Sequence, residues 1–174
     1  MLRATVGATI GDWPPAVKGT AGSVTNAALQ LSQGPLAGME LLTNVARFRS
    51  ERFAPALPED CQVNPEVYGA ELAFWLGAAL ARRGVVTSYP QSEDWGWFIE
   101  YADASGAEFA IHCYNVDGSK DRWLLSLRRF GRKLFGRDKP PLALATPLIT
   151  GIREVLQEES SVSELTWLFP EHAG

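Results

Sequence analysis

The longest regular pattern of apolar and polar positions lies near the middle of the chain, in the segment NPEVYGAELAFWLGAALARRG. Its first residues are typical of a helix start, because Asn64 suits the N-cap and Pro65 the first helical position. Arg82, Arg83 and Gly84 are typical of a helix end. The positions between them are apolar on most sides, as in a buried helix. We therefore predict a largely buried helix from Asn64 to Gly84.

Short apolar or alternating segments, which are typical of strands, flank this helix on both sides. One candidate strand, Leu41–Phe53, precedes the helix. Four more follow it in a row: Val85–Tyr89, Trp95–Ala102, Ala107–Val116 and Arg122–Phe130. The turn sequences DASG and DGSKD join the last three of these strands, and Asp117-Gly118 suits the φ > 0 positions of a tight turn. Links this short predict an antiparallel meander.

A second helix and a last strand complete the pattern. The segment Leu142–Gln157 is helical in pattern, and Pro147 should fall near its first turn, so its regular part should start around Thr146. The segment SELTWLF at residues 163–169 predicts a short strand. Strands gathered into a meander indicate an α+β fold, in which an antiparallel sheet carries two helices packed on one face. The other face of the sheet would then be partly open.

The beginning of the chain differs from the rest. Residues 1–38 are rich in Ala, Gly, Thr, Ser and Pro, and they show no sustained periodicity. We expect them to form a poorly structured N-terminal extension, consistent with a start codon assigned too far upstream of Met39. Residues 39–170 are predicted to be a single α+β domain, and residues 171–174 a tail.

Composition narrows the class of protein. A chain of 174 residues with a net charge of −4 has enough length for one domain with a core, and no overall attraction to nucleic acid or membrane. Cys61 and Cys113 cannot make a disulfide framework, which favours reduced thiols in the cytoplasm. No apolar run approaches the roughly 20 residues that span a bilayer. We therefore expect a cytoplasmic protein that does not enter the membrane.

The stretch SEDWGWFIEY, residues 92–101, is the first candidate site. Alternate residues of a strand share a face, so one face should hold Trp95, Trp97, Ile99 and Tyr101. That face would pack on a helix as ordinary core. Glu93 and Asp94 would lie at the strand end beside the two tryptophans, where they could bind a cationic group with cation–π support from a Trp face.

Glu71 is a second candidate, because it lies within a helix that is otherwise predicted to be buried. A buried carboxylate is costly unless it is paired. On a helical wheel Glu71 lines up near Arg82, and one interpretation makes it a boundary residue capped by an arginine. The other places it in an acidic pocket shared with Glu93 or Asp94.

Basic residues concentrate between residues 120 and 139. This segment holds Lys120, Arg122, Arg128, Arg129, Arg132, Lys133, Arg137 and Lys139. It could be a solvated edge strand and loop, a surface for an acidic protein partner, or a site for phosphate groups. Its glycines do not follow the strand–GxxxxGK[ST]–helix pattern of a phosphate loop. On the predicted strand, Arg128 and Arg129 point to opposite faces.

The sequence indicates no catalytic group, metal site or cofactor. His112 and Cys113 are adjacent on a predicted strand, so their side chains should point to opposite faces and cannot work together as base and nucleophile. No cluster supplies the three or four ligands that a specific metal site requires.

Three stretches resemble a group of small bacterial proteins that is uncharacterised and shorter than this chain. They are CQVNPEVYGAELAFWL, EDWGWFIEY and DGSKDRWLLSLRR with the LFGRDK that follows. The resemblance covers roughly Arg49–Leu168, and it implies that residues 1–38 are additional to the usual length of the group. Because no activity is known for the group, the resemblance implies no catalytic or binding residue.

The sequence favours a non-enzymatic protein-binding module, such as an adaptor, an inhibitor or an immunity-type protein, with another protein or a second copy as partner. One alternative is a small-ligand-binding protein or an enzyme with a carboxylate and tryptophan pocket of Glu71, Glu93, Asp94, Trp95 and Trp97. In an enzyme, one carboxylate of raised pKa would act as acid or base. A second alternative, which the net charge disfavours, is nucleic-acid or phosphate binding through residues 120–139. Convergence of the acids in one pocket would favour the small-ligand class.

A chain truncated to begin at Met39 should fold like the full chain, because residues 1–38 contribute no predicted element. Circular dichroism and urea denaturation of the two chains would measure this. A truncated chain that fails to fold would contradict the prediction.

Overall fold

The computed structural model describes residues 42–62, 64–131 and 139–170. The chain divides into two units, Met1–Ala37 and Gly38–Gly174, and every described residue belongs to the second. The predicted extension of residues 1–38 and the tail of residues 171–174 therefore lie outside the described residues. Both boundaries stay predictions.

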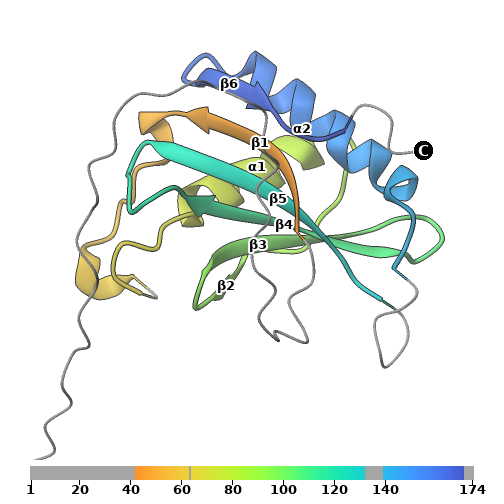
Figure 1. The fold of residues 1–174 in the computed structure, drawn as a ribbon, viewed down its shortest axis with the longest axis horizontal. Coiled ribbons are helices and arrows are strands. Elements are labelled where there is room, and N and C mark those ends of the chain that lie inside the picture. The colour runs from red at the N-terminus through yellow and green to blue at the C-terminus, as the bar shows by residue number, and fades with distance from the viewer. Residues whose placement is uncertain (1–41, 63, 132–138, 171–174) are drawn as a thin grey trace, which may run out of the picture. The chain divides into compact units, whose positions relative to one another are not determined.

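One antiparallel sheet of six strands organises the described residues (Figure 1). The order is β2-β3-β4-β5-β1-β6, so β2 to β5 form a meander, of which β3 to β5 were predicted, and β1 lies between β5 and β6. The strands are β1 Thr43–Arg49, β2 Gln91–Glu93, β3 Gly96–Ala102, β4 Glu108–Asn115, β5 Arg122–Arg129 and β6 Ser163–Trp167. The predicted α+β class is confirmed. So are the three central strands and the last strand, each within a few residues.

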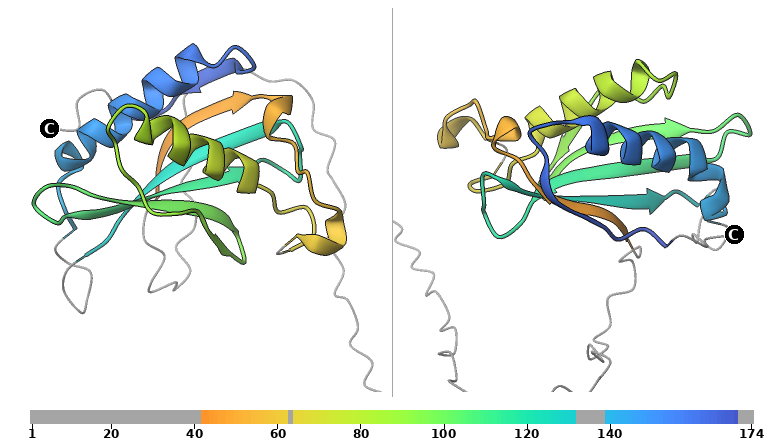
Figure 2. Two further views of the ribbon diagram at one scale, coloured as in Figure 1. Left: turned by 180° about the vertical axis from the view of Figure 1, so that it is seen from behind. Right: turned by 90° about the horizontal axis from the view of Figure 1, so that it is seen from above.

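Two helices, α1 Ala70–Ala81 and α2 Thr146–Glu158, cover one face of this sheet (Figure 2). A short 3-10 turn, Leu142–Ala145, precedes α2, and Pro147 lies in its first turn, so the predicted start at Thr146 is confirmed. The arrangement therefore has two layers, helices over sheet, with the core between them.

The core is built from alternate residues of the central strands. The fully buried side chains of β4 and β5 that face the helices are Phe109, Ile111, Cys113, Trp123, Leu125 and Leu127. Each large apolar side chain buried in this way contributes about 1.5–3 kcal/mol to folding. The indole N–H of Trp123 donates to the carbonyl of Ser50 at 2.9 Å, which satisfies its one polar atom in the core.

Helix α1 begins at Ala70, five residues after Pro65, the predicted first helical residue. Gly69 precedes it with φ of 150°, and a Cβ atom there would overlap the carbonyl oxygen of Cys113 on β4. The residues predicted as the first turn make long-range contacts instead. Asn64 donates through its side-chain amide to the carbonyl of Asp94, and the N–H of Tyr68 binds the side chain of Asn115. Tertiary contacts therefore override the local helix signal.

The end of α1 agrees with the prediction. Gly84 adopts φ of 79°, and the N–H of Val85 donates to the carbonyl of Leu80 at 3.0 Å. This is the left-handed helix end that glycine favours. The chain then reverses toward the sheet.

Two predicted strands differ from the structure. Leu41–Phe53 is too long, because β1 ends at Arg49 and the Ser50 hydroxyl caps a 3-10 turn by accepting from the N–H of Arg52. Val85–Tyr89 is irregular, and the three-residue β2 follows it. Ser88 binds Glu100 of β3 through its own N–H and its side-chain oxygen, at 2.8 Å and 2.9 Å. The Ser88 hydroxyl thus takes the place of a backbone carbonyl as acceptor for the N–H of Glu100, and the regular backbone pairing of two strands is interrupted.

Gly69→Ala should lower the free energy of unfolding by about 3 kcal/mol or more, because the new Cβ adds a clash with β4 to the strain of a positive φ. Gly84→Ala is the matched control, since a Cβ there meets no atom within 4 Å. It should cost only about 1 kcal/mol of backbone strain. Urea denaturation measures both, and equal losses would contradict the close approach at Gly69.

Candidate functional site

The two tryptophans of the predicted pocket lie on opposite faces of the sheet. Trp97 pairs with Cys113 on β4 and faces the helices, with its ring centre 6.1 Å from that of Phe74. Trp95 lies in the turn before β3, and its ring stacks on His112 at 4.0 Å. Gly96, with φ of 144°, separates them and interrupts the alternation. The expectation that Trp95 shares a face with Trp97 is therefore wrong.

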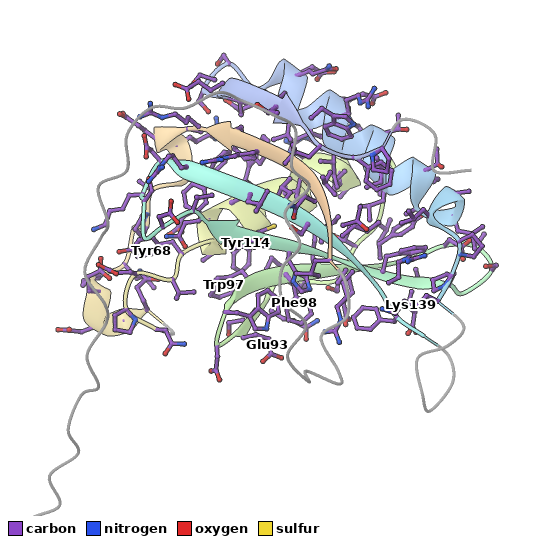
Figure 3. All side chains as sticks on the ribbon, viewed as in Figure 1. Tyr68, Glu93, Trp97, Phe98, Tyr114 and Lys139 are labelled. Carbon is purple, nitrogen blue, oxygen red and sulfur yellow. The ribbon has the colours of Figure 1, made fainter. Side chains whose placement is uncertain are left out.

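Glu93 is exposed at the end of β2 (Figure 3). Asp94 is exposed in the turn that follows. Glu71 lies on α1, and its carboxylate accepts from the backbone N–H of Ala56 at 2.8 Å. Glu71 therefore binds the backbone of the loop before α1. One expectation had been that an arginine would cap it. Neither Glu93 nor Asp94 lines any of the hollows described below.

The described basic residues of β5 are divided between its two ends. Arg122 opens β5, and Arg128 lies six residues further, about 20 Å away at the rise of a strand. The guanidinium of Arg122 is 3.9 Å from the carboxylate of Asp117. That of Arg129 donates to the carbonyl of Pro140 at 3.4 Å. The remaining candidates of this patch, Arg132, Lys133 and Arg137, lie outside the described residues.

His112 and Cys113 point to opposite faces of β4, as expected. Cys113 is fully buried on the helix face, and this burial raises the pKa of its thiol far above the ordinary value. A thiol that stays protonated is a poor nucleophile. His112 lies against Trp95 on the other face.

Within the described ranges, no group of three or more His, Cys, Asp or Glu side chains could hold a metal ion. Among the same residues, no helix has the length and apolar character needed to cross a membrane.

The most distinctive surface feature is an apolar hollow of about 310 Å³ between α1 and residues 85–90. Three large apolar side chains at its edge are exposed: Phe74 at 50%, Val86 at 74% and Tyr89 at 85%. Small residues of α1, including Gly77 and Ala78, line its helix side. We call this feature the apolar hollow.

A second hollow of about 500 Å³ adjoins the first, and residues 86–88 line both. Its other walls come from the end of β3 at Glu100–Ala102, the start of β4 at Glu108 and Phe109, and Phe130 after β5. We call it the acidic hollow, because Glu100 and Glu108 supply its charges. A third hollow of about 260 Å³ shares Glu108 and Phe130 with it and includes Lys139.

Sequence reasoning missed these hollows for a physical reason. Val86 and Tyr89 were assigned to a strand, where their side chains would be packed or paired. The available signals were Pro90, which ends regular pairing, and the small residues Gly77, Ala78 and Ala81 on one side of the helix. Those small residues leave space beside residues 86–90.

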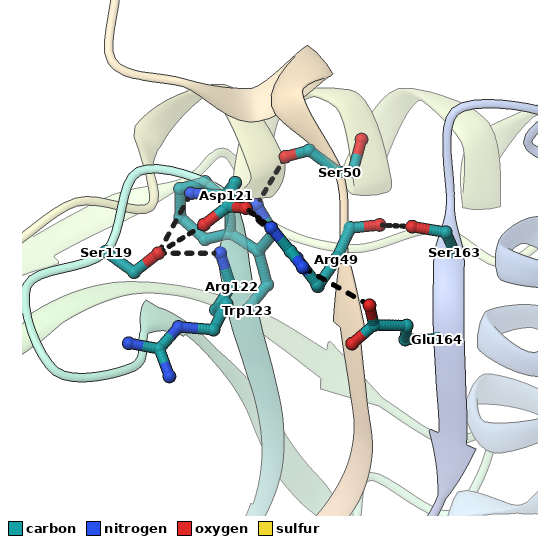
Figure 4. A network of polar contacts seen from close by, with 8 residues as sticks. All are labelled: Arg49, Ser50, Ser119, Asp121, Arg122, Trp123, Ser163 and Glu164. Atoms are coloured by element: carbon teal, nitrogen blue, oxygen red, sulfur yellow. Dashed lines mark hydrogen bonds and ion pairs between the residues drawn. The ribbon is translucent and has the colours of Figure 1, made fainter.

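Charged side chains near the start of β5, at the other end of this strand from the acidic hollow, pair with one another (Figure 4). Arg49 of β1 donates to the carboxylate of Asp121 at 3.0 Å and lies 3.2 Å from that of Glu164 on β6. A hydrogen bond from the Ser119 hydroxyl, with Arg49, lowers the pKa of Asp121. A polar hollow of about 380 Å³ lies here, but its arginines are already neutralised by acids. The cluster therefore fits a structural role, joining β1, β5 and β6.

A second cluster joins the loop before α1 to the turn before β5. The buried Tyr68 donates its hydroxyl hydrogen bond to Glu59, and the Lys120 ammonium lies 3.1 Å from the same carboxylate. These two partners lower the pKa of Glu59, the hydroxyl more than the ammonium. The bond to Glu59 also raises the pKa of Tyr68.

No family model matches the chain, and comparison with curated proteins and with solved structures gave no significant match. The resemblance to small bacterial proteins therefore stays an expectation, and the function has to be argued from the surface itself.

Glu59→Gln should make the stability of the protein less sensitive to acid. The carboxylate has a lower pKa in the folded chain than its ordinary 4.5, so it stabilises the fold above that pH and loses this contribution as the pH falls below it. Urea denaturation between pH 7 and pH 3 should therefore give a smaller decrease for the variant. Glu93→Gln, at the exposed end of β2, is the control and should follow the wild type. Identical curves for all three proteins would contradict the prediction.

Proposed function

We propose that this protein is a non-enzymatic protein-binding module of the cytoplasm, and that the apolar hollow is its contact surface. The observation that carries the proposal is the grouping of Phe74, Val86 and Tyr89, all exposed, around one hollow. Single exposed apolar side chains are ordinary, whereas a contiguous apolar group is typical of an interaction surface. Aromatic side chains such as Phe74 and Tyr89 are also enriched in the residues that dominate binding energy.

The size of the hollow indicates what it would accept. About 310 Å³ is at the lower end of the range for small-molecule sites, and the hollow is open to one side. This volume suits one or two apolar side chains of a partner protein better than a whole cofactor. We therefore commit to a partner protein that inserts an apolar side chain between α1 and residues 85–90, in the manner of an adaptor, inhibitor or immunity-type protein.

The two alternatives have less support. A carboxylate and tryptophan pocket would require Glu71, Glu93 and Asp94 to converge, but Glu71 binds a loop while the other two are exposed at a turn. Nucleic-acid binding would require one basic surface, but the described arginines of β5 are divided between its two ends. The cytoplasmic location is favoured by two cysteines that are free, Cys61 exposed and Cys113 buried.

A double variant, Val86→Ser with Tyr89→Ser, should bind the partner protein much more weakly than the wild type. Removing two anchoring side chains typically costs a few kcal/mol of binding, so capture of a stoichiometric protein from the native host's lysate should fall by about 30-fold or more. The control is Leu57→Ser, because Leu57 is also exposed, at 58%, but lies in the loop before α1 and does not line the apolar hollow. Thermal unfolding should find all three proteins folded.

Equal capture by the wild type and the double variant would contradict the proposal. Sedimentation velocity over a range of concentrations adds a second outcome. A dimer that the double variant loses would identify a second copy as the occupant and would overturn the proposal of a different partner protein.

A further inference from the structure

We propose that the acidic hollow binds a lysine or arginine side chain from the same partner segment whose apolar side chain enters the apolar hollow. This inference rests on the proposed function and specifies the partner's chemistry. Residues 86–88 line both hollows, so a segment that lies across them would contact the two at once. The partner would therefore present an apolar residue and a basic residue close together in an extended segment.

The acidic hollow carries negative charge. Glu100 and Glu108 line it from neighbouring strands, and both are exposed. Among the described residues, no lysine or arginine forms an ion pair with either carboxylate. The side-chain contact of Glu100 is a hydrogen bond from the neutral amide of Gln91 at 3.3 Å. Two carboxylates without a cation, at the edge of a low-dielectric hollow, attract positive charge.

Aromatic side chains also line the acidic hollow. Tyr101 and Phe130, both half-buried, line the hollow with their rings, whereas Phe109 lies behind Tyr101 and is fully buried, with ring centres 6.3 Å apart. Aromatic faces attract ammonium and guanidinium groups. One of these rings already binds a cation in this way, because the guanidinium of Arg128 lies 4.8 Å from the centre of the Phe130 ring. The hollow therefore combines the two features, carboxylates and rings, that recognise a basic side chain.

The neighbouring charges limit where the cation can lie. Lys139 lines the third hollow, which shares Glu108 and Phe130 with the acidic hollow. Arg128 is close to Phe130 as well. The guanidinium of Arg128 already occupies a face of the Phe130 ring, so the basic side chain would approach from the side of residues 86–88. That direction is consistent with a segment that comes from the apolar hollow.

Defined peptides can test the inference with the full chain. The probes are eight-residue peptides on a Gly/Ser background, each with one Leu or Phe and, one to four residues away, either Arg or its neutral analogue citrulline. Fluorescence anisotropy measures their affinities. We expect at least one arginine peptide to bind about fivefold more tightly than its citrulline pair, the scale of a half-exposed ion pair.

Matched variants identify the groups responsible. Glu100→Gln with Glu108→Gln should remove the preference for arginine and leave binding through the apolar residue. Glu93→Gln with Asp94→Gln changes the charge equally at a turn that does not line the hollow, so it should keep the preference. Val86→Ser with Tyr89→Ser should weaken both members of each peptide pair.

Each remaining outcome overturns a specific claim. Equal binding of arginine and citrulline peptides, still dependent on Val86 and Tyr89, would overturn this inference and leave the proposed function standing. Peptide binding that Val86→Ser with Tyr89→Ser leaves unchanged would overturn the proposed function. Saturation by N-acetylarginine methylamide alone, at the affinity of the peptides, would make the acidic hollow a site for free cations and overturn its link to a partner segment. No binding by any arginine peptide would overturn the inference as well.

Discussion

The close approach of α1 to β4 at Gly69 is the constraint on which the rest of the structure depends. The backbone there lies so near the carbonyl of Cys113 that only a residue without a side chain fits. The helix can begin only after that point, which leaves the preceding loop free to bind the side chain of Asn115 and the turn before β5 through Glu59 and Lys120. One contact thus decides the start of the helix, the path of the loop and the position of the helix over the sheet.

The position of α1 also creates the apolar hollow. After Gly84 reverses the chain, residues 85–90 pass beside the helix without joining the sheet as a strand. The Ser88 hydroxyl accepts from the N–H of Glu100, where a strand would use a backbone carbonyl. Pro90 has no backbone N–H to donate to a neighbouring strand. Val86 and Tyr89 therefore remain exposed, at 74% and 85%. Burial would have stabilised the fold, so folding energy does not account for this exposure.

The charged residues are divided between two different uses. At one end of the sheet, Arg49 with Asp121 and Lys120 with Glu59 pair across loops and strands, which satisfies these groups within the protein. At the other end, the carboxylates of Glu100 and Glu108 line a hollow without a paired cation among the described residues. Figure 3 shows Lys139 at the opposite end of the sheet from Tyr68. The paired charges contribute to the fold, whereas Glu100 and Glu108 form no ion pair among the described residues.

Local patterns in the sequence by themselves determined the α+β class, the meander from β3 to β5 with its Asp117-Gly118 turn, the left-handed end of α1 at Gly84 and the start of α2 at Thr146. These features depend on hydrophobic periodicity and on the backbone preferences of single residues, which act over a few positions. Only the tertiary structure decided that α1 starts at Ala70, that Trp95 and Trp97 face opposite sides, and that residues 85–90 leave the sheet. The start of α1 and the path of residues 85–90 depend on Cys113 and Glu100, whose approach no local pattern encodes. Gly96 separates the two tryptophans where it lies against Tyr114 of β4. The candidate site lies where such long-range contacts override the local signals, and for that reason the sequence did not predict it.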